Sequence, residues 1–272
     1  MLLKGIAILS AIAAAAVCFA CGLALWLLPV LFLAFFLALL LVAFGFLWVV
    51  CQLVDLNKPQ YEDSKFYRSV MYVYIEALIS LVLVRLHTKG LEKTPKNGRF
   101  LLVCNHQHEA DPGVLLHCFK KSQLAFISKR ENDSMFIVNK MMHKTLCQLI
   151  NRENDREALR TIIRCIQLIK EDKVSICAFP EGGIKELGKL SHFRSGMFKI
   201  AQKANVPIVV CTLKHTAEII PNWLKLRHTD VELHLVDVIP AKALQGRTTV
   251  DIAEQVYSMM LADLGEDWRP EE

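Results

Sequence analysis

The chain has 272 residues, of which 53% are hydrophobic, and a net charge of +5. This length allows one sizeable domain with an attachment, or two small domains. The modest charge, and the lack of aromatic residues interleaved with basic ones after residue 90, argue against a nucleic-acid groove. They favour anionic lipid surfaces or phosphorylated ligands as partners.

The nine cysteines are odd in number and scattered through apolar patterns, where cysteine behaves as a small hydrophobe. This distribution is typical of a reducing, cytoplasmic compartment rather than of a disulfide framework. The pair Cys18-x-x-Cys21 has the spacing of a redox motif, but it lies in an apolar segment without a second pair. We therefore expect no redox role for it.

The N-terminal segment is the most apolar part of the chain, because no charged residue occurs from Gly5 to Val54. One membrane-spanning helix needs about 20 apolar residues, so this run is long enough for two. A proline near the middle predicts a helical hairpin over residues 5–27 and 31–54, turning near Trp26–Pro29. Two alternatives stay open. The apolar turn is compatible with re-entrant insertion, and the segment before Ala20 imitates a signal peptide.

A hairpin returns the chain to its starting side, where Lys4 is joined by three further basic residues. These are Lys58, Lys65 and Arg68. The positive-inside rule makes this side cytoplasmic. We therefore expect residues 1–54 to anchor the protein in the cell (inner) membrane, with the catalytic domain facing the cytoplasm.

Residues 55–97 are predicted to form a linker and an amphipathic interfacial helix. The helical part, Phe66 to Leu86, is largely apolar but carries three charged side chains, which makes it too short and too costly for a third span. We expect this helix to lie against the membrane surface or to pack on the domain. His87 to Gly98 is rich in turn residues and leads into the domain.

Between residues 98 and 272 strand patterns alternate with helical ones, which predicts an α/β domain with a mainly parallel sheet flanked by helices. The expected strands are residues 100–104, 124–128, 174–179, 207–213 and 231–238. The expected helices are residues 134–150, 155–170, 193–204 and 250–264.

The first candidate site follows the strand at residues 100–104, at the carboxyl end where α/β sheets place their ligands. Its chemistry-bearing side chains are His106, His108, Glu109 and Asp111. Three interpretations are compatible with this cluster. In the first, His106 is a general base oriented by Asp111, and it takes a proton from a substrate hydroxyl, since no serine or cysteine nucleophile is nearby. In the second, the four residues bind the metal of a phosphohydrolase. In the third, they are polar residues of a surface turn.

Two further loops suit an anion. Glu181, Gly182 and Gly183 follow a strand, and the glycines let backbone N–H groups approach an anion closely. An ordinary strand-ending loop is the alternative there. Lys129 and Arg152 lie at the ends of expected elements, where phosphate groups are commonly bound, although Arg152 also has acidic neighbours with which to form a salt bridge.

Four motifs occur in a fixed order over about residues 88–216. They are Asn105-His106-x-x-x-x-Asp111, Lys129-x-Glu131, Phe179-Pro180-Glu181-Gly182 and Val206-Pro207-Ile208-Val209. This ordered set resembles the glycerolipid acyltransferase family, and within it the bacterial 1-acyl-sn-glycerol-3-phosphate (lysophosphatidic acid) acyltransferases. The N-terminal apolar hairpin is also similar to members of that group.

The resemblance implies an O-acyltransferase with the glycerol-3-phosphate acyltransferase-like fold. His106 would deprotonate the sn-2 hydroxyl of a lysophospholipid acceptor, with Asp111 orienting the imidazole. The alkoxide would attack the thioester of acyl-CoA or acyl-carrier protein and give phosphatidic acid. The resemblance implies no metal, no cofactor and no covalent acyl-enzyme.

Carried over in the same way, Glu181 and Gly182 would line the acceptor site, and Lys129 and Arg152 would help to bind its phosphate. The family's arginine after this motif is replaced by Ile184, so its charge would come from another cation. The cations nearby in the sequence are Lys185, Lys189 and Arg194. This departure leaves another lysophospholipid or a small alcohol open as the acceptor.

Overall fold

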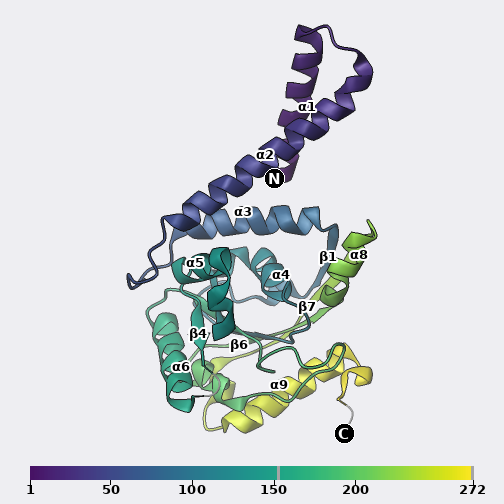
Figure 1. Ribbon diagram of the computed structural model, residues 1–272. Helices are drawn as coiled ribbons and strands as arrows, with labels where there is room; N and C mark the ends of the chain where they lie inside the picture. Colours follow the sequence, from purple (N-terminus) through teal and green to yellow (C-terminus); the bar gives the residue numbers. More distant parts are fainter. Residues whose placement is uncertain (152–153, 271–272) are drawn as a thin grey trace.

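The computed structural model describes residues 1–151 and 154–270, and it shows an apolar helical hairpin projecting from an α/β domain (Figure 1). The helices are α1 (Leu2–Ala20), α2 (Leu28–Gln52), α3 (Lys65–Leu81), α4 (Asp111–Cys118), α5 (Phe136–Lys144), α6 (Asp155–Lys170), α7 (Lys199–Ala204), α8 (Ile219–Leu224) and α9 (Thr249–Leu264). The strands are β1 (Val84–Lys89), β2 (Leu101–Cys104), β3 (Leu124–Lys129), β4 (Gln148–Ile150), β5 (Ser175–Ala178), β6 (Ile208–Lys214) and β7 (Thr229–Ile239).

The strands of the described ranges form one seven-stranded sheet in the order β1-β7-β6-β2-β5-β3-β4. All neighbours are parallel except β6 and β7, which confirms the prediction of a mainly parallel sheet. The carboxyl ends of β2 to β6 therefore share one edge of the sheet, which we call the carboxyl edge. Since β7 runs against β6, β7 begins at this edge, and so does β1.

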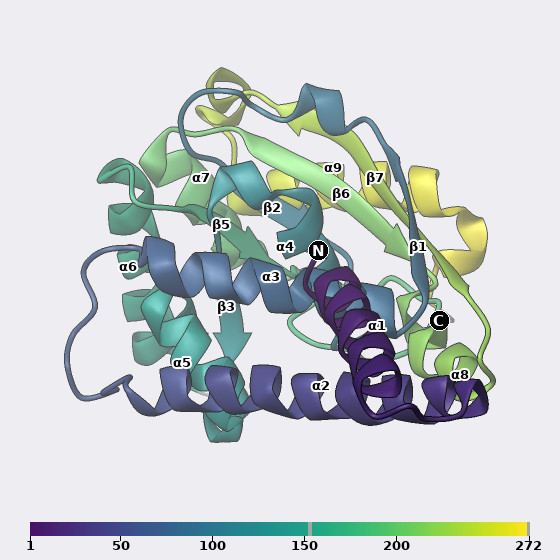
Figure 2. The same cartoon turned by 90° about the horizontal axis from the view of Figure 1, so that it is seen from above.

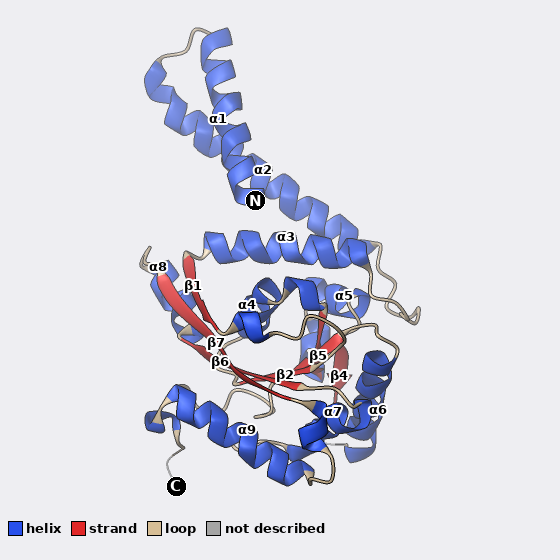
Figure 3. Ribbon diagram, turned by 180° about the vertical axis from the view of Figure 1, so that it is seen from behind, coloured by secondary structure: helices blue, strands red, loops and turns tan. Residues whose placement is uncertain are grey.

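Alternate residues of β2 pack into two hydrophobic layers, one on each face of the sheet. Leu101 and Val103 pack with α6, α7 and α9 on one face of the sheet, whereas Leu102 and Cys104 pack with α4 and with part of α3 on the other. Figure 3 shows these helices on the two sides of the red strands. Because both faces are covered, the strand is a continuous apolar run rather than an alternating one.

The N-terminal hairpin consists of α1 and α2, which lie side by side (Figures 1 and 3). Both helices are long and apolar enough, by length and composition, to cross a membrane. The predicted turn near Trp26–Pro29 was wrong. The chain reverses earlier, around Gly22 at a φ of +59°, where glycine avoids the steric cost of the left-handed region. Pro29 instead lies in the first turn of α2, where its missing N–H costs no hydrogen bond.

A buried arginine ties α3 to the domain. The Nε of Arg68 donates to Asp63 at 2.6 Å, and its two other nitrogens donate to the carbonyl groups of Leu124 and Thr145 at 2.9 and 3.2 Å. Arg68 is one of the basic residues predicted to lie on the cytoplasmic side, and within the domain it is buried, with only 4% of the residue exposed. α3 thus packs on the domain, beneath the hairpin as seen from above (Figure 2).

Two predicted helices end early and give way to strands. The helix expected over residues 66–86 stops before Leu83, which takes a φ of +57°, and the chain continues as β1. The helix expected over residues 134–150 likewise stops before Leu146, at a φ of +63°, and β4 follows. Positive φ is rare for leucine, so neither turn could be predicted from the sequence. The helix expected over residues 193–204 is shorter, and α4 and α8 were not predicted.

Candidate functional site

The loop after β2 brings a histidine and a carboxylate together. The Nδ1 of His106 lies 2.8 Å from an oxygen of Asp111. The same oxygen accepts hydrogen bonds from the backbone N–H groups of Gln107 and His108, at 2.7 and 2.9 Å. Asp111 is fully buried in the first turn of α4, where the helix dipole favours an acidic side chain. Three donors therefore fix this oxygen beside the imidazole.

The imidazole of His106 is held on its face as well as at its edge. Its ring stacks on that of Phe179, with 4.1 Å between the centroids and 14° between the planes. About a fifth of the His106 side chain is exposed, at 18%. When Nδ1–H donates to Asp111, Nε2 is the nitrogen that carries a lone pair. The arrangement is that of a base with one available nitrogen and a fixed orientation.

Glu181 joins this loop to a distant segment. One of its oxygens accepts from the backbone N–H of His106 at 2.7 Å, and the other accepts from that of Ser191 at 2.8 Å. Only 2% of the residue is exposed. Burial raises the pKa of Glu181, and the two backbone donors oppose this shift only in part. Glu181 thus supports the backbone at His106, and its assignment to the acceptor site stays a prediction.

Two buried amides also hold the loop, a role that the sequence interpretation did not assign to either of them. Asn105 exchanges hydrogen bonds with the backbone N–H and C=O of Leu213, at 2.7 and 2.9 Å. Gln107 accepts from the N–H of Gly188 at 2.6 Å and donates to the carbonyl of Lys189 at 3.2 Å. Polar side chains that directly follow a buried strand need hydrogen-bond partners, and from this requirement the role of the two amides could have been predicted.

The glycine loop after β5 lies against an arginine. Gly182 has a φ of +78°, and a Cβ added there would be 2.8 Å from the Nε of Arg194. The backbone N–H of Arg194 donates to the carbonyl of Pro180 at 2.9 Å, which holds the two segments together. Within the described ranges, the guanidinium of Arg194 makes no hydrogen bond or ion pair. One of the three cations considered as replacements at Ile184 is thus beside the loop, and its charge is available.

The other residues assigned to phosphate binding are two exposed lysines and one residue outside the described ranges. Lys129 ends β3 at the carboxyl edge and Lys185 follows Gly183, and both side chains are exposed. Among residues whose placement is described, no hydrogen bond or ion pair joins either lysine to His106. Arg152 lies outside the described residues.

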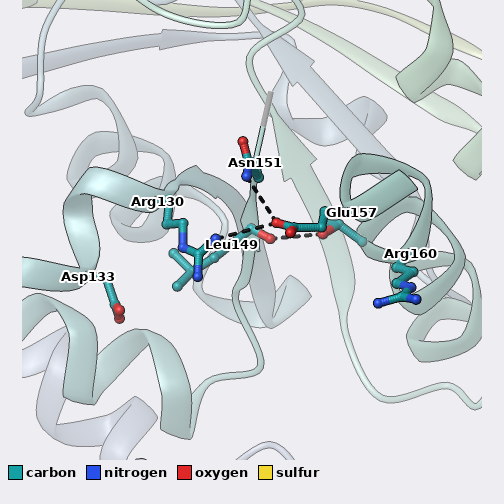
Figure 4. A pocket seen from close by; sticks show the side chains of 7 residues that line it. Arg130, Asp133, Leu149, Asn151, Glu157 and Arg160 are labelled. Atoms are coloured by element: carbon teal, nitrogen blue, oxygen red, sulfur yellow. Dashed lines mark hydrogen bonds and ion pairs between the residues drawn. The ribbon is translucent and has the colours of Figure 1, made fainter. Parts of the chain in front are cut away.

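A pocket of about 390 Å³ lies near the ends of β3 and β4 and the start of α6 (Figure 4). Its lining residues are Arg130, Asp133, Leu149, Asn151, Glu157, Arg160 and Thr161. Glu157 accepts from Asn151 at 3.0 Å and from Arg130 at 3.4 Å, as the dashed lines show. The acidic groups Asp133 and Glu157 offset the two arginines, so the pocket is not a purely cationic anion site. β5 and β3 separate it from β2.

His108 and Glu109 do not complete a metal site with His106 and Asp111. The Nδ1 of His108 accepts from the backbone N–H of Ala110 at 3.2 Å, and Glu109 is exposed. The part of the chain with described placement contains no group of three or more His, Cys, Asp or Glu arranged to hold a metal ion. The donor geometry thus favours a base with its orienting carboxylate.

The chain is similar in sequence to known acyltransferases. The family model described as acyltransferase matches residues 85–214. A probable 1-acyl-sn-glycerol-3-phosphate acyltransferase of Mycoplasma pneumoniae is 30% identical over 179 residues, which are 64% of this chain and 64% of that protein. A chloroplastic 1-acyl-sn-glycerol-3-phosphate acyltransferase of Brassica napus is 32% identical over 148 residues, or 53% of this chain and 42% of that protein. The alignments thus span less than two thirds of these relatives.

The fold has a counterpart among solved structures. The crystal structure of the 1-acyl-sn-glycerophosphate acyltransferase from Thermotoga maritima superposes with a TM-score of 0.63. The match covers 84% of this chain and 90% of that one, at 21% sequence identity. At this identity the likeness concerns the fold, and it agrees with the α/β sheet described above.

Proposed function

We propose that this protein, whose residues 85–214 match the acyltransferase family model, transfers an acyl group from a thioester to the sn-2 hydroxyl of 1-acyl-glycerol-3-phosphate. The observation that carries this proposal is the pair of His106 and Asp111, joined at 2.8 Å at the carboxyl end of β2. The relatives named for this reaction support the choice of acceptor.

In the proposed reaction, Nε2 of His106 removes the proton of the acceptor hydroxyl as the oxygen attacks the thioester carbonyl. Asp111 keeps Nδ1 protonated and stabilises the imidazolium that forms. The tetrahedral intermediate then collapses, the C–S bond breaks, and the departing sulfur takes the proton from His106. The proton is thus returned within one cycle, and no covalent acyl-enzyme, metal or cofactor takes part. Acyl-CoA and acyl-carrier protein are both suitable donors for this step.

We place the phosphate of the acceptor beside Gly182, bound by Arg194. A guanidinium binds phosphate through two parallel hydrogen bonds, and a glycine without Cβ lets the anion come close to the backbone. This position for the cation supplies the charge that Ile184 lacks. The exposed side chains of Lys129 and Lys185 would add to the positive potential around the site.

The apolar hairpin supports a location at the cytoplasmic surface of the cell (inner) membrane. Both the acceptor and the product carry acyl chains that reside in the bilayer. A membrane anchor thus holds the domain where its substrate is concentrated.

A panel of acceptors tests the proposal. Purified full-length protein in vesicles would be given labelled acyl-CoA or acyl-carrier protein together with lysophosphatidic acid, lysophosphatidylcholine or glycerol 3-phosphate. We expect the fastest transfer to lysophosphatidic acid. Absence of transfer from both donors would refute the proposal, and a preference for another acceptor would refute the choice of substrate.

The phosphate contact has its own test in the same assay. Arg194→Ala removes a charged hydrogen-bonding group, so we expect the KM for lysophosphatidic acid to rise about 10-fold to 100-fold. Lys203→Ala, at another exposed cation, is the matched control and leaves the KM unchanged. An unchanged KM in Arg194→Ala would contradict the assignment.

A further inference from the structure

The end of α8 presents a surface that the acyl-transfer chemistry does not use. Leu224 and Leu226 are 72% and 83% exposed, so neither side chain is part of the core. Lys225 and Arg227 alternate with them and are exposed as well. We call residues 219–228 the α8 tip.

The charges of the α8 tip have one sign. Residues 219–228 contain no acidic side chain. Lys225 and Arg227 form no ion pair within the described ranges. The acidic residues on either side, Glu218 and Asp230, are each paired with a histidine at 2.8 Å. Apolar side chains between unpaired cations are typical of a segment that binds an anionic lipid surface.

The α8 tip lies on the side of the domain from which the hairpin projects. The carbonyl of Leu83, just after α3, is 3.1 Å from the Nδ1 of His228 and accepts from the N–H of Thr229 at 3.2 Å. The end of α3 adds the exposed side chains of Leu78 and Leu81 to the same region. Figures 1 and 3 both show the end of α8 reaching the level of α3, below the hairpin. The tip is thus continuous with the proposed membrane-facing side.

The sheet register relates the α8 tip to the catalytic loop. β6 runs parallel to β2 and reaches the carboxyl edge at Lys214, and the tip connects it to β7, which starts there at Thr229. His106 follows β2 at the same edge. A bilayer that contacts the tip therefore lies along the edge of the sheet that carries the catalytic loop.

We propose that the α8 tip is a second membrane contact, in addition to the hairpin. Leu224 and Leu226 enter the headgroup and upper acyl region of an anionic bilayer. Lys225 and Arg227 bind the phosphates of the lipids around them. This proposal rests on the proposed membrane location of the hairpin. Its consequence is that the carboxyl edge faces the bilayer, so a lysophospholipid reaches His106 by lateral diffusion within the membrane.

A native reporter, Trp223, lies within the α8 tip. Replacing Trp26 and Trp48 by phenylalanine removes the tryptophans of the hairpin and leaves only Trp268 besides the reporter. The full-length variant would be placed in phosphatidylglycerol vesicles with and without brominated acyl chains. We expect the brominated lipid to quench Trp223 fluorescence at least twofold, and the quenching to disappear in a further Trp223→Phe variant.

A tryptophan on the opposite side of the domain is the matched control. Val250 is 52% exposed at the start of α9, on the side away from the hairpin (Figure 1). Val250→Trp, made in the variant that lacks Trp223, should not be quenched. An unquenched Trp223 would overturn the second contact. If Trp26 and Trp48 of the wild type are quenched in that case, the anchor still stands.

A functional measurement separates this inference from the proposed reaction. Leu224→Glu/Leu226→Glu should lower acyl transfer to vesicle-embedded lysophosphatidic acid at least fivefold, while transfer to detergent-solubilised acceptor stays unchanged. Val250→Glu should change neither rate. Equal rates on vesicles for the leucine variant and the wild type would contradict the inference. Loss of transfer in every format for the wild type would instead refute the proposed function.

Discussion

Replacing Asp111 by asparagine tests the role of its charge with little change of shape. The amide oxygen can take the place of the carboxylate oxygen that accepts from His106 and from two backbone N–H groups. The other oxygen has no hydrogen-bond partner among the described residues, so the NH₂ group fits there without breaking a bond. The variant therefore keeps the geometry and removes the negative charge.

The expected loss follows from the charge pair in the transition state. A carboxylate and an imidazolium about 4 Å apart attract by about 4 kcal/mol at an effective dielectric constant of about 20. At 1.36 kcal/mol per factor of ten, Asp111→Asn should lower kcat about 10³-fold. The KM for the acceptor should change little, since Asp111 is buried behind His106.

The assay measures initial rates of acyl transfer. Thermal unfolding shows that the variant is folded. The control is Asp230→Asn, because Asp230 also pairs with a histidine at 2.8 Å, but at an exposed position on β7, which β6 separates from β2. We expect wild-type rates for the control. A folded Asp111→Asn variant with a kcat within threefold of the wild type would refute the reasoning.

Three further predictions concern packing and capping. Gly182→Ala places a Cβ 2.8 Å from Arg194 at a φ of +78°, so the KM for the acceptor should rise several-fold; an unchanged KM would place the phosphate elsewhere. Arg68→Met leaves a buried carboxylate unpaired, so denaturant unfolding should show a loss of about 3–5 kcal/mol, and a loss below about 1 kcal/mol would contradict this account. The hydroxyl of Thr248 lowers the pKa of Asp251, so the stability from this cap is fully present above the ordinary aspartate pKa and is lost as the pH falls through the lowered value. Asp251→Asn should remove that part of the pH dependence of the free energy of unfolding. Parallel pH curves for the variant and the wild type would contradict this prediction.

The central elements of the fold were predictable because their patterns are strong. The strand at residues 100–104 is apolar throughout since both of its faces are buried, and the helix over residues 155–170 has clear helical spacing with a capping asparagine before it. β1 was not predictable in this way. Most of its side chains are exposed, and the turn at Leu83 that separates it from α3 uses a positive φ without glycine.

The site was predictable where neighbours in the sequence are also neighbours in space. Asp111 reaches back to His106 because the intervening residues form one tight turn before α4. The stack of Phe179 on His106 and the approach of Arg194 to Gly182 depend on how β2, β5 and the following loop meet, which residue spacing does not encode. The same holds for the α8 tip, because its leucines and cations could be assigned to the side of the hairpin only once the structure placed them beside the end of α3.

The most direct test of the central claim is the fate of labelled acyl-CoA or acyl-carrier protein given to the purified protein with lysophosphatidic acid and a metal chelator. We predict that the wild type forms phosphatidic acid labelled at the sn-2 position, and that a folded His106→Ala variant forms it at least about 10²-fold more slowly. Loss of wild-type activity in the chelator, or product formation by His106→Ala at a rate close to that of the wild type, would contradict the claim that His106 is the base of a metal-independent acyl transfer.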